Sequence, residues 1–136
     1  MGGPIKALTV PLIGASLLAS CSYSYPVEVT IKHGEVVFDV DQKLDGCLSF
    51  LNIVDLTSGS SVWRLEREDR TNSCQRQFPI AYGRAPEGLR EVKKAKPLRP
   101  GVLYRIEGFD PVRYYGAFNI NSDGSVSSQP EMARAP

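Results

Sequence analysis

Apolar and polar residues alternate regularly in the chain from residue 27 onward. Over residues 27–31 the odd positions are apolar and the even positions polar, and a similar period of two returns over residues 36–40. A period of two places one face of a strand in the core and the other in solvent. His33 and Gly34 lie between the two segments and supply a turn. The pattern therefore predicts a β-hairpin over residues 27–40.

Further short apolar segments follow, separated by stretches rich in Gly, Pro, Asn, Asp and Ser. We predict strands over residues 47–56, 62–67, 78–82, 89–94, 102–107 and 114–120, with a short edge strand at Val126. Within residues 47–56 the apolar side chains change parity, which predicts a bulge or a strand that is covered on both faces. No helical period of 3.6 residues extends over a useful length after residue 21. The predicted fold class is therefore all-β, an antiparallel β-sandwich of about seven or eight strands.

The first twenty residues follow a different pattern. Residues 7–18 form a mostly apolar stretch of twelve residues, and Lys6 precedes it. Twelve residues fall short of the roughly 20 that a helix needs to cross a bilayer, and they suit the central region of a cleaved secretory signal. We therefore predict a signal peptide at 1–20, a lipidated tether at 21–26, a β-sandwich domain at 27–127 and a disordered tail at 128–136.

The apolar stretch ends in Leu18-Ala19-Ser20-Cys21, a branched residue and two small residues before a cysteine. This motif resembles the lipobox of bacterial lipoproteins. The resemblance implies cleavage after Ser20 and attachment of acyl chains such as palmitate to Cys21, which would anchor the protein in a membrane. Ser22 stands where an aspartate would retain such a protein at the inner membrane. The implied location is the cell envelope, at the outer membrane and facing the periplasm.

A second motif concerns the fold. Residues 98–104 read Leu-Arg-Pro-Gly-Val-Leu-Tyr, which resembles the entry to the penultimate strand of fibronectin type III domains. The resemblance implies a Greek-key sandwich of the immunoglobulin and fibronectin III kind. It also implies a tyrosine corner, in which the hydroxyl of Tyr104 bonds to backbone a few residues upstream, Gly101 permits the turn and Leu98 packs beneath. Cys74 lies only eleven residues after Trp63, too early for the usual immunoglobulin bridge between the sheets.

Two cysteines, Cys47 and Cys74, remain in the mature domain. In an oxidising compartment such a pair is most simply a disulfide. In the chain-entropy model a loop of this size contributes on the order of 3–4 kcal/mol to stability. The alternative of a redox or metal-binding pair lacks C-x-x-C spacing and a neighbouring histidine.

Charge is unevenly distributed along the mature sequence. Residues 22–69 hold nine acidic and four basic side chains, a balance of −5, and residues 70–136 hold eleven basic and six acidic ones, a balance of +5. The basic stretch contains Arg84, Arg90, Lys93, Lys94, Lys96 and Arg99. One interpretation is a solvated edge strand whose lysines prevent unwanted pairing. The other is a surface for an anionic glycan, a lipid headgroup or an acidic protein.

Groups that could carry catalysis or bind a metal are few. His33 is the only histidine and is predicted to lie in a turn, so we expect no Ser-His-Asp triad. Asp39 and Asp41 have the spacing that begins a calcium loop, but the fifth position is Lys43 and the glycine comes two places late. The other aspartates considered for calcium are Asp45 and Asp55. We predict no catalytic residue, no metal ligand and no cofactor.

These features together predict a non-enzymatic envelope lipoprotein that acts as an interaction module or as an accessory subunit of an envelope complex. Its expected partners are a membrane, through the lipid on Cys21, and an envelope protein of unknown identity, but no nucleic acid. Tyr23 and Tyr25 follow the anchor closely enough to rest at the level of the headgroups. The alternatives are a small envelope inhibitor or a glycan- or lipid-binding protein and, further off, a hydrolase that uses two carboxylates.

We expect Cys47 and Cys74 of the exported protein to be oxidised to a disulfide. Alkylation without reductant should therefore leave the intact mass of the mature domain unchanged, whereas alkylation after reduction should modify both residues. The reduced sample is the control for access of the reagent. Two alkylated thiols in the unreduced sample would contradict the bridge.

Overall fold

A computed structural model of the chain describes residues 23–68 and 75–129. These residues form ten strands and no helix, so the predicted all-β class is confirmed. The strands are β1 (Ser24–Pro26), β2 (Glu28–Lys32), β3 (Glu35–Asp39), β4 (Phe50–Asp55), β5 (Ser60–Arg67), β6 (Ile80–Ala81), β7 (Leu89–Lys93), β8 (Leu103–Phe109), β9 (Arg113–Ile120) and β10 (Val126–Ser128). Ten exceeds the predicted seven or eight because the short edge strand at Val126 forms and because β1, three residues of the predicted tether, was not expected.

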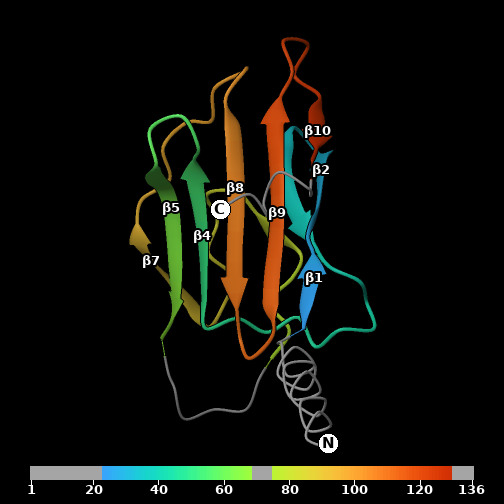
Figure 1. Cartoon of the computed structure of the whole chain (residues 1–136). Coiled ribbons are helices and arrows are strands. Elements are labelled where there is room, and N and C mark those ends of the chain that lie inside the picture. The colour runs from blue at the N-terminus through green and yellow to red at the C-terminus, as the bar shows by residue number, and fades with distance from the viewer. Residues whose placement is uncertain (1–22, 69–74, 130–136) are drawn as a thin grey trace, which may run out of the picture.

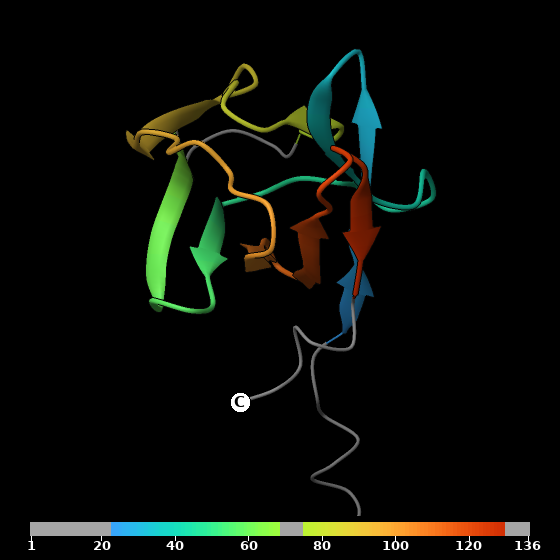
Figure 2. The ribbon, with the colours of Figure 1, turned by 90° about the horizontal axis from the view of Figure 1, so that it is seen from above.

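The strands form two sheets that face each other. The larger sheet has seven strands in the order β1-β9-β8-β4-β5-β7, with β10 also paired to β9, and the smaller sheet has the order β2-β3-β6 (Figure 1). Seen from above, the smaller sheet covers one face of the larger one (Figure 2). The arrangement is consistent with a β-sandwich. The other face of the larger sheet carries polar side chains together with a small apolar cluster of Tyr115, Ala117 and Leu103.

The predicted hairpin at residues 27–40 is confirmed. Strands β2 and β3 pair in antiparallel fashion from Glu28↔Asp39 to Lys32↔Glu35. His33 and Gly34 both adopt positive φ, 53° and 78°. Two central residues with positive φ make the tight turn whose twist matches that of the flanking strands.

The core between the sheets is built from the inward parity of each strand. Leu51 and Ile53 of β4 face Trp63 and Leu65 of β5, and all four side chains have 0% exposure. The register of β4 and β5 shifts between Ile53 and Val54. Residues 47–56 therefore contain a bulge, but it lies three residues after the change of apolar parity between Phe50 and Leu51. The buried rings that complete the core are Phe38, Phe78, Tyr104, Tyr114 and Phe118.

Residues 21–26 were predicted to form a tether, but the last three of them form a strand of the domain. Ser24–Pro26 forms β1, which pairs in parallel with the first residues of β9. Val27 still bonds to the larger sheet, because its N–H donates to the carbonyl of Tyr115 at 2.8 Å. The next residue begins β2, so the chain crosses to the smaller sheet at this point. The ordered domain therefore begins before residue 27.

The C-terminal boundary also lies further along the chain than predicted. The turn at residues 121–125 leads into β10, which pairs with β9 from Val126↔Ile120 to Ser128↔Phe118. Gln129 then donates its backbone N–H to Ala117 O at 2.6 Å and its side-chain amide to Asn119 Oδ1 at 2.6 Å. Residues 128 and 129 therefore belong to the sheet, and the rest of the predicted tail lies outside the described residues.

The contact expected of a tyrosine corner is present at Tyr104. Its hydroxyl accepts a hydrogen bond from the backbone N–H of Arg99, five residues upstream, at 2.8 Å. Gly101 has a φ of +80°, and Leu98 packs against the core. The buried ring of Tyr104 thus holds the connection that leads into β8.

Candidate functional site

Two of the residues to which the sequence assigned a role cannot be placed. Cys21 and Cys74 lie outside the described residues, so lipid attachment and the disulfide stay predictions. Cys47 is buried, with 3% exposure, just before β4. His33 is exposed on the turn between β2 and β3.

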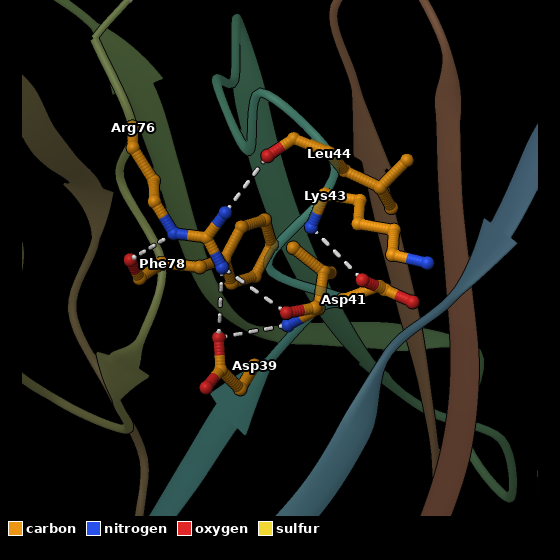
Figure 3. Close-up of polar contacts among 7 residues, drawn as sticks. Asp39, Asp41, Lys43, Leu44, Arg76 and Phe78 are labelled. Carbon is orange, nitrogen blue, oxygen red and sulfur yellow. Dashed lines mark hydrogen bonds and ion pairs between the residues drawn. The ribbon is translucent and has the colours of Figure 1, made fainter.

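Three of the four aspartates considered for calcium, Asp39, Asp41 and Asp55, accept hydrogen bonds from backbone N–H groups. Asp41 accepts the N–H of Lys43 at 2.9 Å, and Asp39 forms an ion pair with Arg76 at 3.3 Å (Figure 3). Asp55 lies at the far end of β4 and caps the turn that follows it. Within residues 23–68 and 75–129, no three His, Cys, Asp or Glu side chains gather in a way that could hold a metal ion.

Arg76 ties the loop after β3 to the segment that leads into β6. Its guanidinium donates to three backbone carbonyl oxygens in addition to the Asp39 carboxylate (Figure 3). The acceptors are Phe78 O at 3.1 Å, Leu44 O at 2.8 Å and Val40 O at 3.1 Å. A Cβ at Gly46 would lie 2.9 Å from Arg76 Cγ, so this close approach requires glycine. The cluster is a structural clamp rather than an open site.

The basic stretch does not form one continuous patch of available cations. Arg84 pairs with Glu35 at 2.9 Å, and Arg99 approaches Asp55 at 3.4 Å. Arg90 and Lys93 lie on β7, the outermost strand of the larger sheet. Charged side chains along an outer strand oppose pairing with another chain, which favours the edge-strand interpretation.

A groove opens on the outer face of the larger sheet, where β4, β5 and β8 end or begin side by side. We call it the aromatic–arginine groove; it has a volume of about 400 Å³ and is lined by Ser49, Phe50, Arg64, Glu66, Arg67 and Phe109. Phe50 and Phe109 are directly paired across β4 and β8, with ring centroids 6.4 Å apart and planes 22° apart. The guanidinium carbon of Arg64 lies 4.7 Å from the centroid of the Phe50 ring.

Neighbouring groups hold the two arginines in place. Arg64 Nε forms a 2.9 Å ion pair with Glu66, and Arg67 pairs with Asp110 while its Nε donates to Leu48 O at 3.1 Å. The guanidinium of Arg64 is therefore stacked on one side and paired at one edge. Such planar cations bind carboxylates, phosphates and aromatic rings of a partner. The groove can recognise another molecule, but it presents no nucleophile paired with a base.

A second, more open hollow of about 480 Å³ lies at the opposite end of the larger sheet. Its lining is Asp55, Ser58, Ser60, Val62, Lys96, Pro97, Arg99 and Tyr104. Burial alone would raise the pKa of Asp55, but the backbone N–H groups of Thr57 and Ser58 and the charge of Arg99 outweigh burial and lower the pKa below its usual value of 3.8. The N–H donors lie 2.8 and 3.2 Å from the carboxylate. The Asp55 carboxylate is thus ionised near neutral pH, where it accepts hydrogen bonds from the turn and has no proton to donate.

Sequence reasoning found only part of the groove. The period of two over residues 62–67 places Arg64 and Glu66 on the parity opposite Trp63 and Leu65, and both line the groove. Phe50 and Phe109 were missed because nothing local shows that two residues so distant in the chain are neighbours across a strand pair. Arg67 was likewise not linked to Asp110, which lies in the turn after β8.

Comparisons with known proteins found no match from which a role for the groove could be inferred. The chain matches no protein-family model, and no curated protein or solved structure matches it either. In the part of the chain that the structure describes, no helix is long and apolar enough to cross a membrane. Function must therefore be argued from this chain's own residues.

We expect Asp55→Asn to lower the stability of the domain at neutral pH and to weaken its acid dependence. Because the folded-state pKa of Asp55 is lowered, its carboxylate stabilises the fold above the unfolded pKa of 3.8 and loses this contribution as pH falls through the folded value. The stability difference between wild type and variant should thus shrink on acidification. Urea denaturation measured across acidic to neutral pH tests this, with the exposed Asp45→Asn as control. An equal difference at all pH values would contradict the role of Asp55.

Proposed function

We propose that this protein is a membrane-anchored envelope lipoprotein of non-enzymatic role, acting as an interaction module or as an accessory subunit of an envelope complex. The observation that carries the binding role is the aromatic–arginine groove. Aromatic side chains and arginine are enriched at protein–protein interfaces and among the residues that contribute most binding energy. In this groove they lie on the outer face of a sheet whose inner face already forms the core. Packing of the domain's own core therefore does not explain them.

The anchoring role rests on the lipobox-like motif at Leu18-Ala19-Ser20-Cys21. The absence of an aspartate at position 22 favours the outer membrane, where the organism has one, and we propose that the domain faces the periplasm. The structure adds support from the other side of the junction, since β1 begins three residues after Cys21. A protein anchored at Cys21 would be held close to its membrane.

We further propose that the fold is a Greek-key sandwich of the immunoglobulin and fibronectin III kind. In support, the chain passes repeatedly between the sheets: β2 and β3 lie in the smaller sheet, β4 and β5 in the larger, β6 in the smaller, and β7, β8 and β9 in the larger. The neighbours β9-β8-β4-β5 and β2-β3-β6 follow the strand order of such domains. The hydrogen bond from Arg99 to the hydroxyl of Tyr104 agrees with this assignment.

We expect Cys21→Ala to release the protein from membranes. Without the acylated sulfur, the anchor loses its buried methylenes, each of which contributes about 0.8 kcal/mol. Fractionation of cells into membrane and soluble parts, followed by immunoblotting, measures the change. Ser22→Ala, which keeps the cysteine, is the matched control and should stay with the membrane. Persistence of Cys21→Ala in the membrane fraction would argue against lipid anchoring.

We expect Arg64→Ala to weaken capture of a partner protein from native membranes in mild detergent. Removing an arginine that is central to an interface costs more than about 1 kcal/mol, or roughly a factor of ten in affinity. The control is Arg90→Ala on β7, an exposed arginine of the same sheet outside the groove. Equal recovery of the partner by both variants would remove the groove from the proposal. Arg64-dependent binding of a glycan, with no protein partner, would favour the alternative of a glycan-binding protein.

A further inference from the structure

The position of the lipid relative to the domain is set by β1. Ser24, Tyr25 and Pro26 pair with Arg113, Tyr114 and Tyr115 of β9. The pairing extends one residue further, because the carbonyl of Tyr23 accepts the N–H of Arg113 at 3.1 Å. The backbone is therefore fixed to the sheet from Tyr23 onward.

Very little chain separates this fixed point from the proposed anchor. Only Ser22 lies between Cys21 and Tyr23. Since an extended chain advances at most 3.3–3.6 Å per residue, the Cα of Cys21 lies within roughly 7 Å of the Cα of Tyr23. The headgroup layer of one leaflet is itself only about 5–8 Å thick. This inference rests on the proposed lipidation of Cys21, and it follows that Tyr23 would lie in or beside the headgroups.

The part of the domain around Tyr23 has the composition of a membrane-facing surface. We call it the anchor end: Tyr23, the last residue of β8, the turn at residues 110–112 and the first residue of β9, all at the lower end in Figure 1. The side chains of Tyr23 and Phe109 are 71% and 43% exposed. Arg113 and Pro111 are exposed beside them. Aromatic rings favour the boundary between headgroups and acyl chains, and arginine reaches lipid phosphates from there.

The opposite end of the sandwich is polar. The turn at residues 56–59 and the turn at residues 121–125 lie there, since Asp55 pairs with Tyr104 and Val126 with Ile120. Their exposed side chains include Thr57, Ser58, Ser122 and Asp123. The seven residues of β8 separate the two ends by roughly 20 Å. The two ends therefore differ: aromatic rings are exposed at the anchor end, whereas the other end exposes small polar groups and one aliphatic side chain, Ile31, which is 38% exposed.

Arginines balance some of the acidic groups near the anchor end. Asp110 is paired with Arg67 and Glu66 with Arg64, so these charges are balanced. Glu68 is exposed after the end of β5, and Asp45 is exposed in the loop before β4, so this end of the domain also carries negative charge. Contact with lipid therefore depends on the aromatic rings and on one arginine rather than on a large positive field.

We propose that the anchor end lies against the phospholipid headgroups of the membrane that holds the Cys21 lipid, with Tyr23 and Phe109 at the level of the headgroups and Arg113 on lipid phosphate. The sheet strands then stand away from the membrane, and the polar turns point into the periplasm. The aromatic–arginine groove opens sideways, close to the membrane surface, because Phe109 belongs to both the groove and the anchor end.

The test uses the full lipidated protein, purified from membranes and reconstituted in vesicles of phosphatidylethanolamine and phosphatidylglycerol with brominated acyl chains. Phe109→Trp keeps an aromatic ring at the anchor end, and Ser58→Trp places the same reporter at the opposite end. The buried Trp63 is the same background in both. We expect bromine to quench Phe109→Trp several-fold more than Ser58→Trp. Adding Arg113→Glu to Phe109→Trp should reduce that quenching, whereas Arg90→Glu should not.

The outcomes separate this inference from the proposed function. If the protein does not float with the vesicles, the lipid anchor itself is refuted. If it floats but the two reporters are quenched equally, or Ser58→Trp more strongly, the anchor stands and the membrane-facing anchor end is wrong. If a photo-crosslinker at position 109 reacts in native membranes with protein and not with lipid, a protein partner covers this end and the inference also fails.

Discussion

The parallel pairing of β1 with β9 is the constraint on which the rest of the structure depends. The pairing adds a three-residue strand to the larger sheet, beside the first residues of β9. The chain then passes at Val27 to the smaller sheet. β10 pairs with the other half of the same edge of β9, so one strand carries both ends of the domain. The same pairing determines how far the domain can lie from Cys21. If Cys21 carries the proposed lipid, this three-residue strand links the fold to the position of the domain relative to the membrane.

Alternation along the chain predicted which face of each strand is buried, because the side chains of successive residues in a strand point to opposite faces. Trp63, Leu65 and Ile106 lie inward as expected, and residues 47–56 contain a bulge, three residues after their change of apolar parity. β1 escaped prediction because three residues show no period, and its hydrogen bonds go to a strand near the other end of the chain. β6 is shorter than expected, two residues against five. Local alternation does not determine how many residues find a partner in a neighbouring strand.

The candidate site was harder to predict than the fold for the same reason. Arg64 is an ordinary outward residue by its pattern, and only the pairing of β4 with β8 brings the Phe50 and Phe109 rings together beneath it. The spacing of Asp39 and Asp41, which begins like a calcium loop, is used for a backbone hydrogen bond and for the Arg76 clamp. Residue type suggested chemistry in both cases, but strand neighbours decided which side chains meet.

A short tether changes how strong a surface contact needs to be. Two exposed aromatic rings and one arginine would hold a free protein on a membrane only weakly, since a small buried area must offset the loss of rotational and translational freedom. In the proposed lipoprotein, insertion of the lipid already restricts the motion of the domain relative to the membrane. Contact at the anchor end is then an intramolecular event at high effective concentration. Weak contacts then suffice to orient the domain. A domain oriented in this way presents the aromatic–arginine groove at a constant height above the lipid, within reach of partners that are themselves in or beside the same membrane.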